Sequence, residues 1–140
     1  MKRLLLFALA ALWLGSAGAR AEDVVAVVSA RSPLVSLGTN QVADIFLGKT
    51  SRFPDGTLAV PIDLNEDSPA REKFYVQLTG KSPAQMKAHW SKIIFTGRGQ
   101  PPRQVASNAE ARKAIAENPS AIGYIDASQV DASVKVLAIR

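Results

Sequence analysis

The chain contains no cysteine and a single histidine, His89. Without cysteine it can form no disulfide, zinc finger, iron–sulfur cluster or cysteine nucleophile. His89 has no second histidine with which to share a metal ion. The spacing of its neighbours places it at the border of the buried face of a helix, where we expect a satisfied structural histidine. These absences predict that the protein carries no metal and no cofactor.

Recognisable catalytic motifs are also missing. The chain has no Gly-x-Ser-x-Gly, no His-Glu-x-x-His and no phosphate-binding Walker loop. His89 has no visible partner arrangement for base catalysis. Glu66 and Asp67 are adjacent, so their side chains diverge on an extended loop and form no acid–base pair. We therefore expect no enzyme, and a hydrolase is the weakest of the functions considered.

The first residues have the composition of a secretory signal peptide. Lys2 and Arg3 precede an apolar run over residues 4–14, which is too short to span a bilayer. Ala19-Arg20-Ala21 fits a small-residue cleavage site. This pattern predicts a signal peptide over residues 1–21, cleaved near Ala21. It predicts a mature domain over residues 22–140 that is located in the periplasm and is not membrane-embedded.

Removal of the signal segment lowers the charge. The whole chain has 17 Lys and Arg against 12 Asp and Glu, hence a formal charge of +5. Lys2, Arg3 and Arg20 leave with the segment and no acidic residue does, so residues 22–140 carry only +2. The remaining basic residues are scattered along the sequence. Nothing in this charge pattern predicts nucleic acid as a partner.

Strand and helix patterns alternate after the signal segment. Residues 24–29 form a valine-rich apolar run typical of a buried strand. Residues 58–64, 121–126 and 134–139 predict three further strands. Pro61 would place the second of these at a sheet edge or at a strand end. Interleaved strands and helices predict an α/β sheet covered by helices on both faces.

Helix starts are marked by capping residues, which are Thr39, Ser68, Ser82 and Ser107. Gly48 and Gly80 mark the ends of the first two helices. In the third, Met86, Trp90, Ile93 and Ile94 recur at helical spacing and predict the buried face. The stretch from Thr96 to Arg103 predicts a loop.

The helix start at Ser68 also predicts an anion site. Ser68 can cap the helix, and Pro69 suits its first position, where no amide donor is needed. The free backbone amides at such an end face outward and attract anions. The plainer alternative is that Ser68 serves only as a cap.

Several segments, in order, resemble segments of phosphate-type solute-binding proteins. Residues 37–49 are similar to their Leu-Ala-x-Ile-Phe-x-Gly-Lys segment, and residues 118–125 to their Pro-Gly-Ala-Ile-Gly-Tyr-Val strand. Residues 53–55 occupy the position of a Trp-x-Asp turn, and residues 68–74 that of the phosphate loop. Residues 94–102, Ile-Phe-Thr-Gly-Arg-Gly-Gln-Pro-Pro, resemble the short, single-lobe members named phosphate ABC transporter substrate-binding proteins.

This resemblance implies one lobe of a type 2 periplasmic binding protein, an α/β fold with a mixed sheet of about four to five strands flanked by helices. It implies recognition of an oxyanion, with inorganic phosphate favoured, in uptake or sensing. The family's phosphate loop is Arg-x-Asp-Gly-Ser-Gly-Thr. Ser68 keeps its serine and Glu66 a carboxylate, whereas the arginine, both glycines and the threonine are replaced by Leu64, Asp67, Pro69 and Ala70.

Two arginines could supply the missing positive charge. Arg71 lies in the first turn of the same helix, and Arg98 lies between Gly97 and Gly99. A guanidinium can hold an oxyanion through two parallel hydrogen bonds. The candidate anion-binding residues are therefore Ser68, Arg71, Arg98, Glu66, Ala70 and Gly97. The alternatives are a solvated charge at Arg71 and a simple turn around Arg98.

A single lobe offers only half of a ligand cleft, because closure by a hinge needs two bodies. Tight binding is therefore expected to require a homodimer or a partner, such as an ABC permease or another envelope protein. The alternative function is a non-enzymatic periplasmic adaptor that has kept the fold and lost phosphate binding.

Three other residues are expected mainly to pack or to turn. Trp90 is predicted to lie in the core. Tyr124 is predicted to pack, with its hydroxyl within reach of the crevice at the strand ends. Asp63 lies at a strand end, where ligands of α/β sheets gather, and is a weaker candidate for the site.

Overall fold

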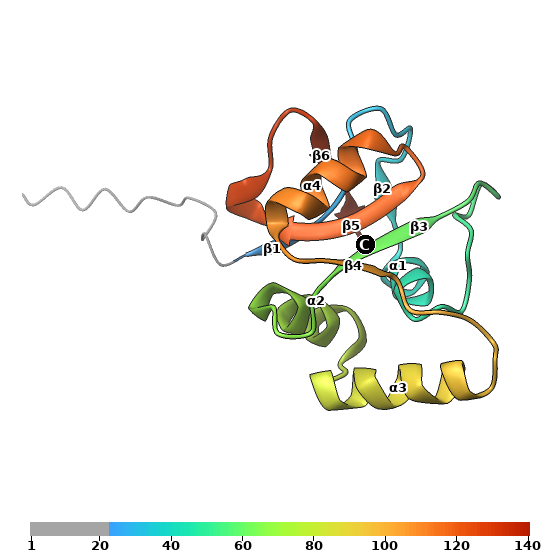
Figure 1. The fold of residues 1–140 in the computed structure, drawn as a ribbon. Helices are drawn as coiled ribbons and strands as arrows, with labels where there is room; N and C mark the ends of the chain where they lie inside the picture. Colours follow the sequence, from blue (N-terminus) through green and yellow to red (C-terminus); the bar gives the residue numbers. More distant parts are fainter. Residues whose placement is uncertain (1–22) are drawn as a thin grey trace, which may run out of the picture.

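The computed structural model of the protein describes residues 23–140 (Figure 1). The signal-peptide prediction for residues 1–21 lies outside the described residues. In chain order the elements are β1 Val24–Ser29, β2 Ser36–Leu37, α1 Thr39–Phe46, β3 Val60–Leu64, α2 Pro69–Thr79, α3 Pro83–Phe95, β4 Arg103–Val105, α4 Asn108–Glu117, β5 Ala121–Asp126, a 3-10 turn Ala127–Gln129, β6 Val134–Val136 and β7 Ala138–Ile139. Among the described residues, no helix has the length and apolar character needed to cross a membrane.

Five strands form one mixed sheet in the order β4-β3-β5-β1-β6. Strand β3 pairs in parallel with both β4 and β5, while β1 runs antiparallel to β5 and β6. The short strands β2 and β7 form a separate parallel pair. The predicted fold class, a mixed sheet of about four to five strands flanked by helices, is confirmed.

Helices cover both faces of the sheet, as two neighbouring residues of β5 show. A Cβ at Gly123 would meet the Ile115 side chain of α4 at 2.5 Å, so α4 packs directly on this face. Tyr124 points the opposite way. Its ring stacks on Phe74 of α2 and lies edge-on to Phe46 of α1. Figure 1 shows α3 set apart from the sheet, beyond α2.

The capping residues fix most of the predicted boundaries. Strands β1 and β5 have the predicted bounds. The Ser68 hydroxyl caps α2 by accepting from the Arg71 amide, and Gly80 ends that helix with a left-handed φ of 71°. Ser82 and Ser107 cap α3 and α4 in the same way. At α1 the prediction was one residue off, because Gly38 takes the capping position and Thr39 is already helical.

The sheet corrects the edge prediction for Pro61. Strand β3 lies between β4 and β5 rather than at an edge, although Pro61 is the second residue of the strand. The Val60 amide bonds to Ser120 on the β5 side, so the nitrogen of Pro61 faces β4. Pairing with β4 begins only at Ile62. Pro61 therefore occupies a local edge where no donor is required.

Three further local predictions need correction. Residues 134–139 form two strands instead of one, because the partner changes at Leu137: its amide bonds to Ala26 of β1, and that of Ala138 bonds to Val35. The loop predicted from Thr96 to Arg103 is one residue too long, because Arg103 is already the first residue of β4. Ile94 is 56% exposed rather than buried.

Candidate functional site

The centre of the molecule holds a buried carboxylate, Asp63, near the end of β3. Its side chain is 1% exposed. One carboxylate oxygen accepts from the Tyr124 hydroxyl and from the Leu64 amide at 2.9 Å. The other accepts from the Tyr75 hydroxyl at 2.7 Å and from Arg71 Nε at 3.4 Å. Four donors, one of which is the cation Arg71, thus stabilise a carboxylate that would otherwise be costly to bury.

Aromatic rings enclose this network. Tyr124 stacks on Phe74 with ring centroids 4.0 Å apart, and the Arg71 guanidinium lies 5.0 Å from the centroid of the Tyr75 ring. Burial raises the pKa of Tyr75 and of Tyr124, and the negative charge of Asp63 raises both further. Both hydroxyls therefore remain protonated and keep donating to the carboxylate at neutral pH.

Arg71 connects the buried network to an open cavity. The cap at Ser68 places Arg71 in the first turn of α2, with its side chain only 7% exposed. Nε is held by Asp63, while the two terminal amino groups make no hydrogen bond or ion pair within residues 23–140. The guanidinium lines a cavity of about 390 Å³. One edge of this cation is thus fixed and the other remains available to a ligand.

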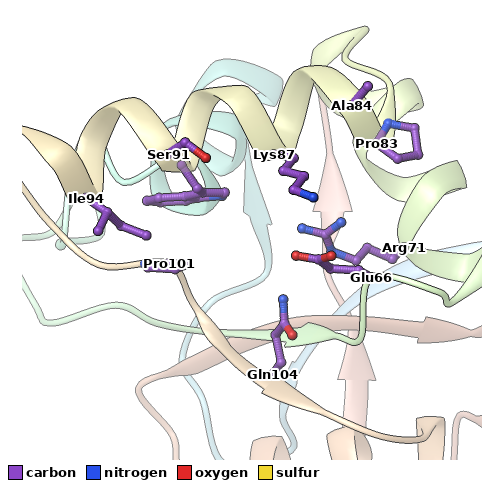
Figure 2. A pocket seen from close by; sticks show the side chains of 10 residues that line it. Glu66, Arg71, Pro83, Ala84, Lys87, Ser91, Ile94, Pro101 and Gln104 are labelled. Carbon is purple, nitrogen blue, oxygen red and sulfur yellow. The ribbon is translucent and has the colours of Figure 1, made fainter.

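We call this space the Arg71 cavity and define it by Glu66, Arg71, Lys87, Trp90, Ser91 and Gln104 among its lining residues. In Figure 2, Lys87 from α3, Gln104 from β4 and Arg71 extend toward the same space, with Glu66 beside Arg71. Lys87 and Arg71 bring two positive charges and Glu66 one negative charge. Lys87 makes no ion pair within the described part of the chain. The cavity can therefore offer several hydrogen-bond donors to a small anion.

Trp90 also lines the cavity. The residue is 6% exposed, as expected of a core tryptophan, yet its indole nitrogen has no hydrogen-bond partner in the structure as described. A buried N–H without a partner is uncommon in native proteins.

The structure brings together two of the six candidate residues. Glu66 and Arg71 both line the Arg71 cavity. Ser68 caps α2, and Ala70 is buried against the core. Gly97 forms the turn after α3, and Arg98 lines two other hollows. Anion binding by any of these residues stays a prediction.

Sequence reasoning missed Lys87 and Gln104, because neither belongs to a motif. It also missed the network around Asp63, although Arg71, in the first turn of a helix, follows this strand-end residue by only eight positions. The interpretation of His89 agrees with the structure. Its ring is half-buried and Nε2 lies 2.8 Å from the Leu47 carbonyl oxygen.

No family model and no curated sequence matches the chain. Solved structures do match it. An ABC-type phosphate transport receptor from Vibrio cholerae is 21% identical with a TM-score of 0.65, over 83% of this chain and 45% of that chain. A phosphate ABC transporter substrate-binding protein from Clostridium perfringens, with bound phosphate, is 19% identical with a TM-score of 0.67, over 83% and 44%. PstS from Borrelia burgdorferi is 14% identical with a TM-score of 0.63, over 84% and 47%.

The chain has the fold of one lobe of a phosphate-binding protein. It spans less than half of the length of each of these structures. At such low identity the likeness establishes the fold alone, and any ligand must be argued from the lobe's own residues.

Proposed function

We propose that this lobe is a non-enzymatic, exported binding module that recognises an oxyanion, with inorganic phosphate as the ligand, in uptake or sensing. The observation that carries the proposal is the placement of Arg71. Its Nε is tied to a buried carboxylate, and its free edge faces a cavity shared with Lys87. A fixed guanidinium loses little conformational freedom when it binds, and it suits the geometry of phosphate oxygens.

The fold supports the same proposal. Three solved structures that share the fold are named for phosphate transport or phosphate binding, or as PstS, and one of them holds phosphate. The Arg71 cavity follows β3 and the start of α2, where ligands of open α/β sheets bind beyond the strand ends. In this lobe the ligand would contact Arg71, Lys87 and Gln104.

Glu66 opposes a divalent anion in the same cavity. Its carboxylate would repel phosphate, so the balance depends on Arg71 and Lys87. Substitutions of Lys87 and of Glu66 should therefore change the affinity for phosphate in opposite directions. Removing the charge of Lys87 weakens phosphate binding, whereas removing the charge of Glu66 strengthens it.

The test is isothermal titration of the purified protein with phosphate at fixed ionic strength. We expect saturable heat, a loss of about tenfold in affinity for Lys87→Gln and a gain of about threefold for Glu66→Gln. Lys113→Gln, an exposed lysine of α4 outside the cavity, serves as the matched control and leaves binding unchanged. A flat titration at millimolar phosphate, or equal effects of Lys87→Gln and Lys113→Gln, would refute phosphate binding at this cavity.

A second candidate function is favoured by the replaced loop. Leu64, Pro69 and Ala70 stand where the resembling family has its arginine, a glycine and its threonine, and Pro69 removes an amide donor. A periplasmic adaptor that acts through an envelope partner, such as a permease, or as a homodimer needs none of these groups. Capture of an envelope protein without phosphate, together with a flat titration, would favour the adaptor.

A further inference from the structure

A second region of the lobe gathers positive charge without any acidic residue. Two hollows of about 530 and 740 Å³ adjoin and share Gly48, Lys49 and Arg98 in their linings. Arg52 also lines the first hollow, and Lys92 also lines the second. No aspartate or glutamate lines either one. We call this region, defined by Lys49, Arg52, Lys92 and Arg98, the basic hollow.

The four cations come from different parts of the chain. Lys49 and Arg52 follow α1, Lys92 lies in the last turn of α3, and Arg98 follows that helix. All four are exposed and make no ion pair among residues 23–140. Arg52 uses part of its guanidinium to donate to the Gly56 carbonyl at 2.9 Å. The fold thus brings together cations that are scattered in the sequence.

Helix ends offset part of this charge. The C-terminal ends of α1 and α3 each carry a partial negative charge of about half a unit, which stabilises nearby cations. Two such ends compensate roughly one of the four positive charges. The other three repel one another across the hollow, and only a bound anion or screening by salt would relieve that repulsion.

The hollow also offers neutral donors. Thr50, Ser51 and Gln100 line its first part, together with Trp90. Trp90 lines the Arg71 cavity as well. Arginine and hydroxyl donors with no acidic competitor suit phosphate oxygens, and the two hollows together exceed the space that one phosphate requires.

We propose that the basic hollow binds a polyanion that carries two or more phosphate groups. Four cations on two loops and one helix can engage several phosphates at once, whereas a single phosphate would leave most of them uncompensated. This site uses different charged residues from the Arg71 cavity, so it stands or falls independently of phosphate binding there. The source of the phosphates is either a free oligophosphate or the head groups of an anionic membrane.

The experiment titrates the purified protein with sodium tripolyphosphate at constant ionic strength, and measures sedimentation with vesicles of phosphatidylglycerol or of phosphatidylcholine. We expect binding to tripolyphosphate with a loss of about tenfold for Arg98→Gln and a similar loss for Lys49→Gln. Lys113→Gln on α4 and Lys87→Gln in the Arg71 cavity change this affinity by less than about twofold. The last comparison separates the two sites, because Lys87→Gln is expected to weaken phosphate binding.

Each outcome decides the proposal. Binding of tripolyphosphate that depends on Arg98 and Lys49 assigns a free oligophosphate. If the protein does not bind tripolyphosphate but sediments with phosphatidylglycerol vesicles in an Arg98-dependent way, and not with phosphatidylcholine vesicles, the ligand is the lipid head groups. Absence of both, or binding that Arg98→Gln and Lys49→Gln leave unchanged, overturns the proposal.

Discussion

The Arg71 cavity and the basic hollow are both lined by Trp90, and they hold their positive charges in opposite ways. Arg71 is buried and held by a carboxylate that also accepts from two tyrosines. The cations of the hollow are exposed and have no carboxylate partner among residues 23–140. The charge of Arg71 therefore contributes to the stability of the core, whereas a cation of the basic hollow can be removed at little cost to the fold.

The two regions should differ most in how much stability is lost when a charge is removed. Asp63→Asn leaves the buried Arg71 guanidinium without its countercharge, and we expect a loss of about 3–5 kcal/mol in the free energy of unfolding. Arg98→Gln removes an exposed cation and should change it by less than about 0.5 kcal/mol. Urea denaturation of both variants measures the difference.

The pairing between Asp63 and Arg71 can be checked with a double variant. Asp63→Asn combined with Arg71→Met removes both charges, so the double variant should lose less stability than the two single variants together. If the losses were additive, or if Asp63→Asn cost no more than Arg98→Gln, the pairing with Asp63 would not stabilise the buried Arg71 guanidinium.

The two tyrosines of the buried network make the stability depend on pH. In the folded state the pKa of Tyr75 and of Tyr124 is raised above the ordinary value of 10.0. A raised pKa gives stability that is complete below about pH 10 and falls as the pH rises, by about 1.4 kcal/mol per pH unit for each tyrosine. Urea denaturation at pH 8 and at pH 11 measures this loss in the wild type.

The Tyr75→Phe, Tyr124→Phe double variant is the control for that measurement. Each single change removes a hydrogen bond to a charged carboxylate, which costs about 1.5–3 kcal/mol at pH 8. Between pH 8 and pH 11 lysines deprotonate in both proteins, so both should lose some stability. The double variant should lose less than the wild type, because it lacks the two tyrosines whose pKa is raised. Equal losses would show that the tyrosines titrate as if they were exposed.

Signals between neighbouring residues made most of the fold predictable. The cap at Ser68, the left-handed Gly80 and the capping box at Ser82 depend on residues within one helical turn, and the structure confirms them. The change of partner at Leu137 depends on strands far away in the chain. The order of the strands, which gives Pro61 its place inside the sheet, is equally non-local.

The site was less predictable for the same reason. Arg71 follows the capping motif and was found from it. Lys87 and Gln104 line the Arg71 cavity only because α3 and β4 lie on opposite sides of it, and no spacing in the sequence encodes that arrangement. Arg98 was grouped with Arg71 by residue type, whereas the structure places it in the basic hollow with Lys49.

Two glycines that end helices differ in how closely they approach Trp90. Gly48 and Gly97 end α1 and α3 with φ of 73° and 68°, so alanine at either position meets backbone strain of roughly 1–2 kcal/mol. A Cβ at Gly48 would also lie 2.8 Å from the Trp90 ring, whereas a Cβ at Gly97 would meet nothing within 4 Å. Gly48→Ala should therefore cost about 1 kcal/mol more than Gly97→Ala in urea denaturation, and it alone should shift the tryptophan fluorescence.

Since Trp90 lines both regions, Gly48→Ala should disturb binding of both phosphate and tripolyphosphate, and Gly97→Ala only that of tripolyphosphate. Equal costs and unchanged fluorescence would mean that Trp90 moves freely and does not separate the two regions.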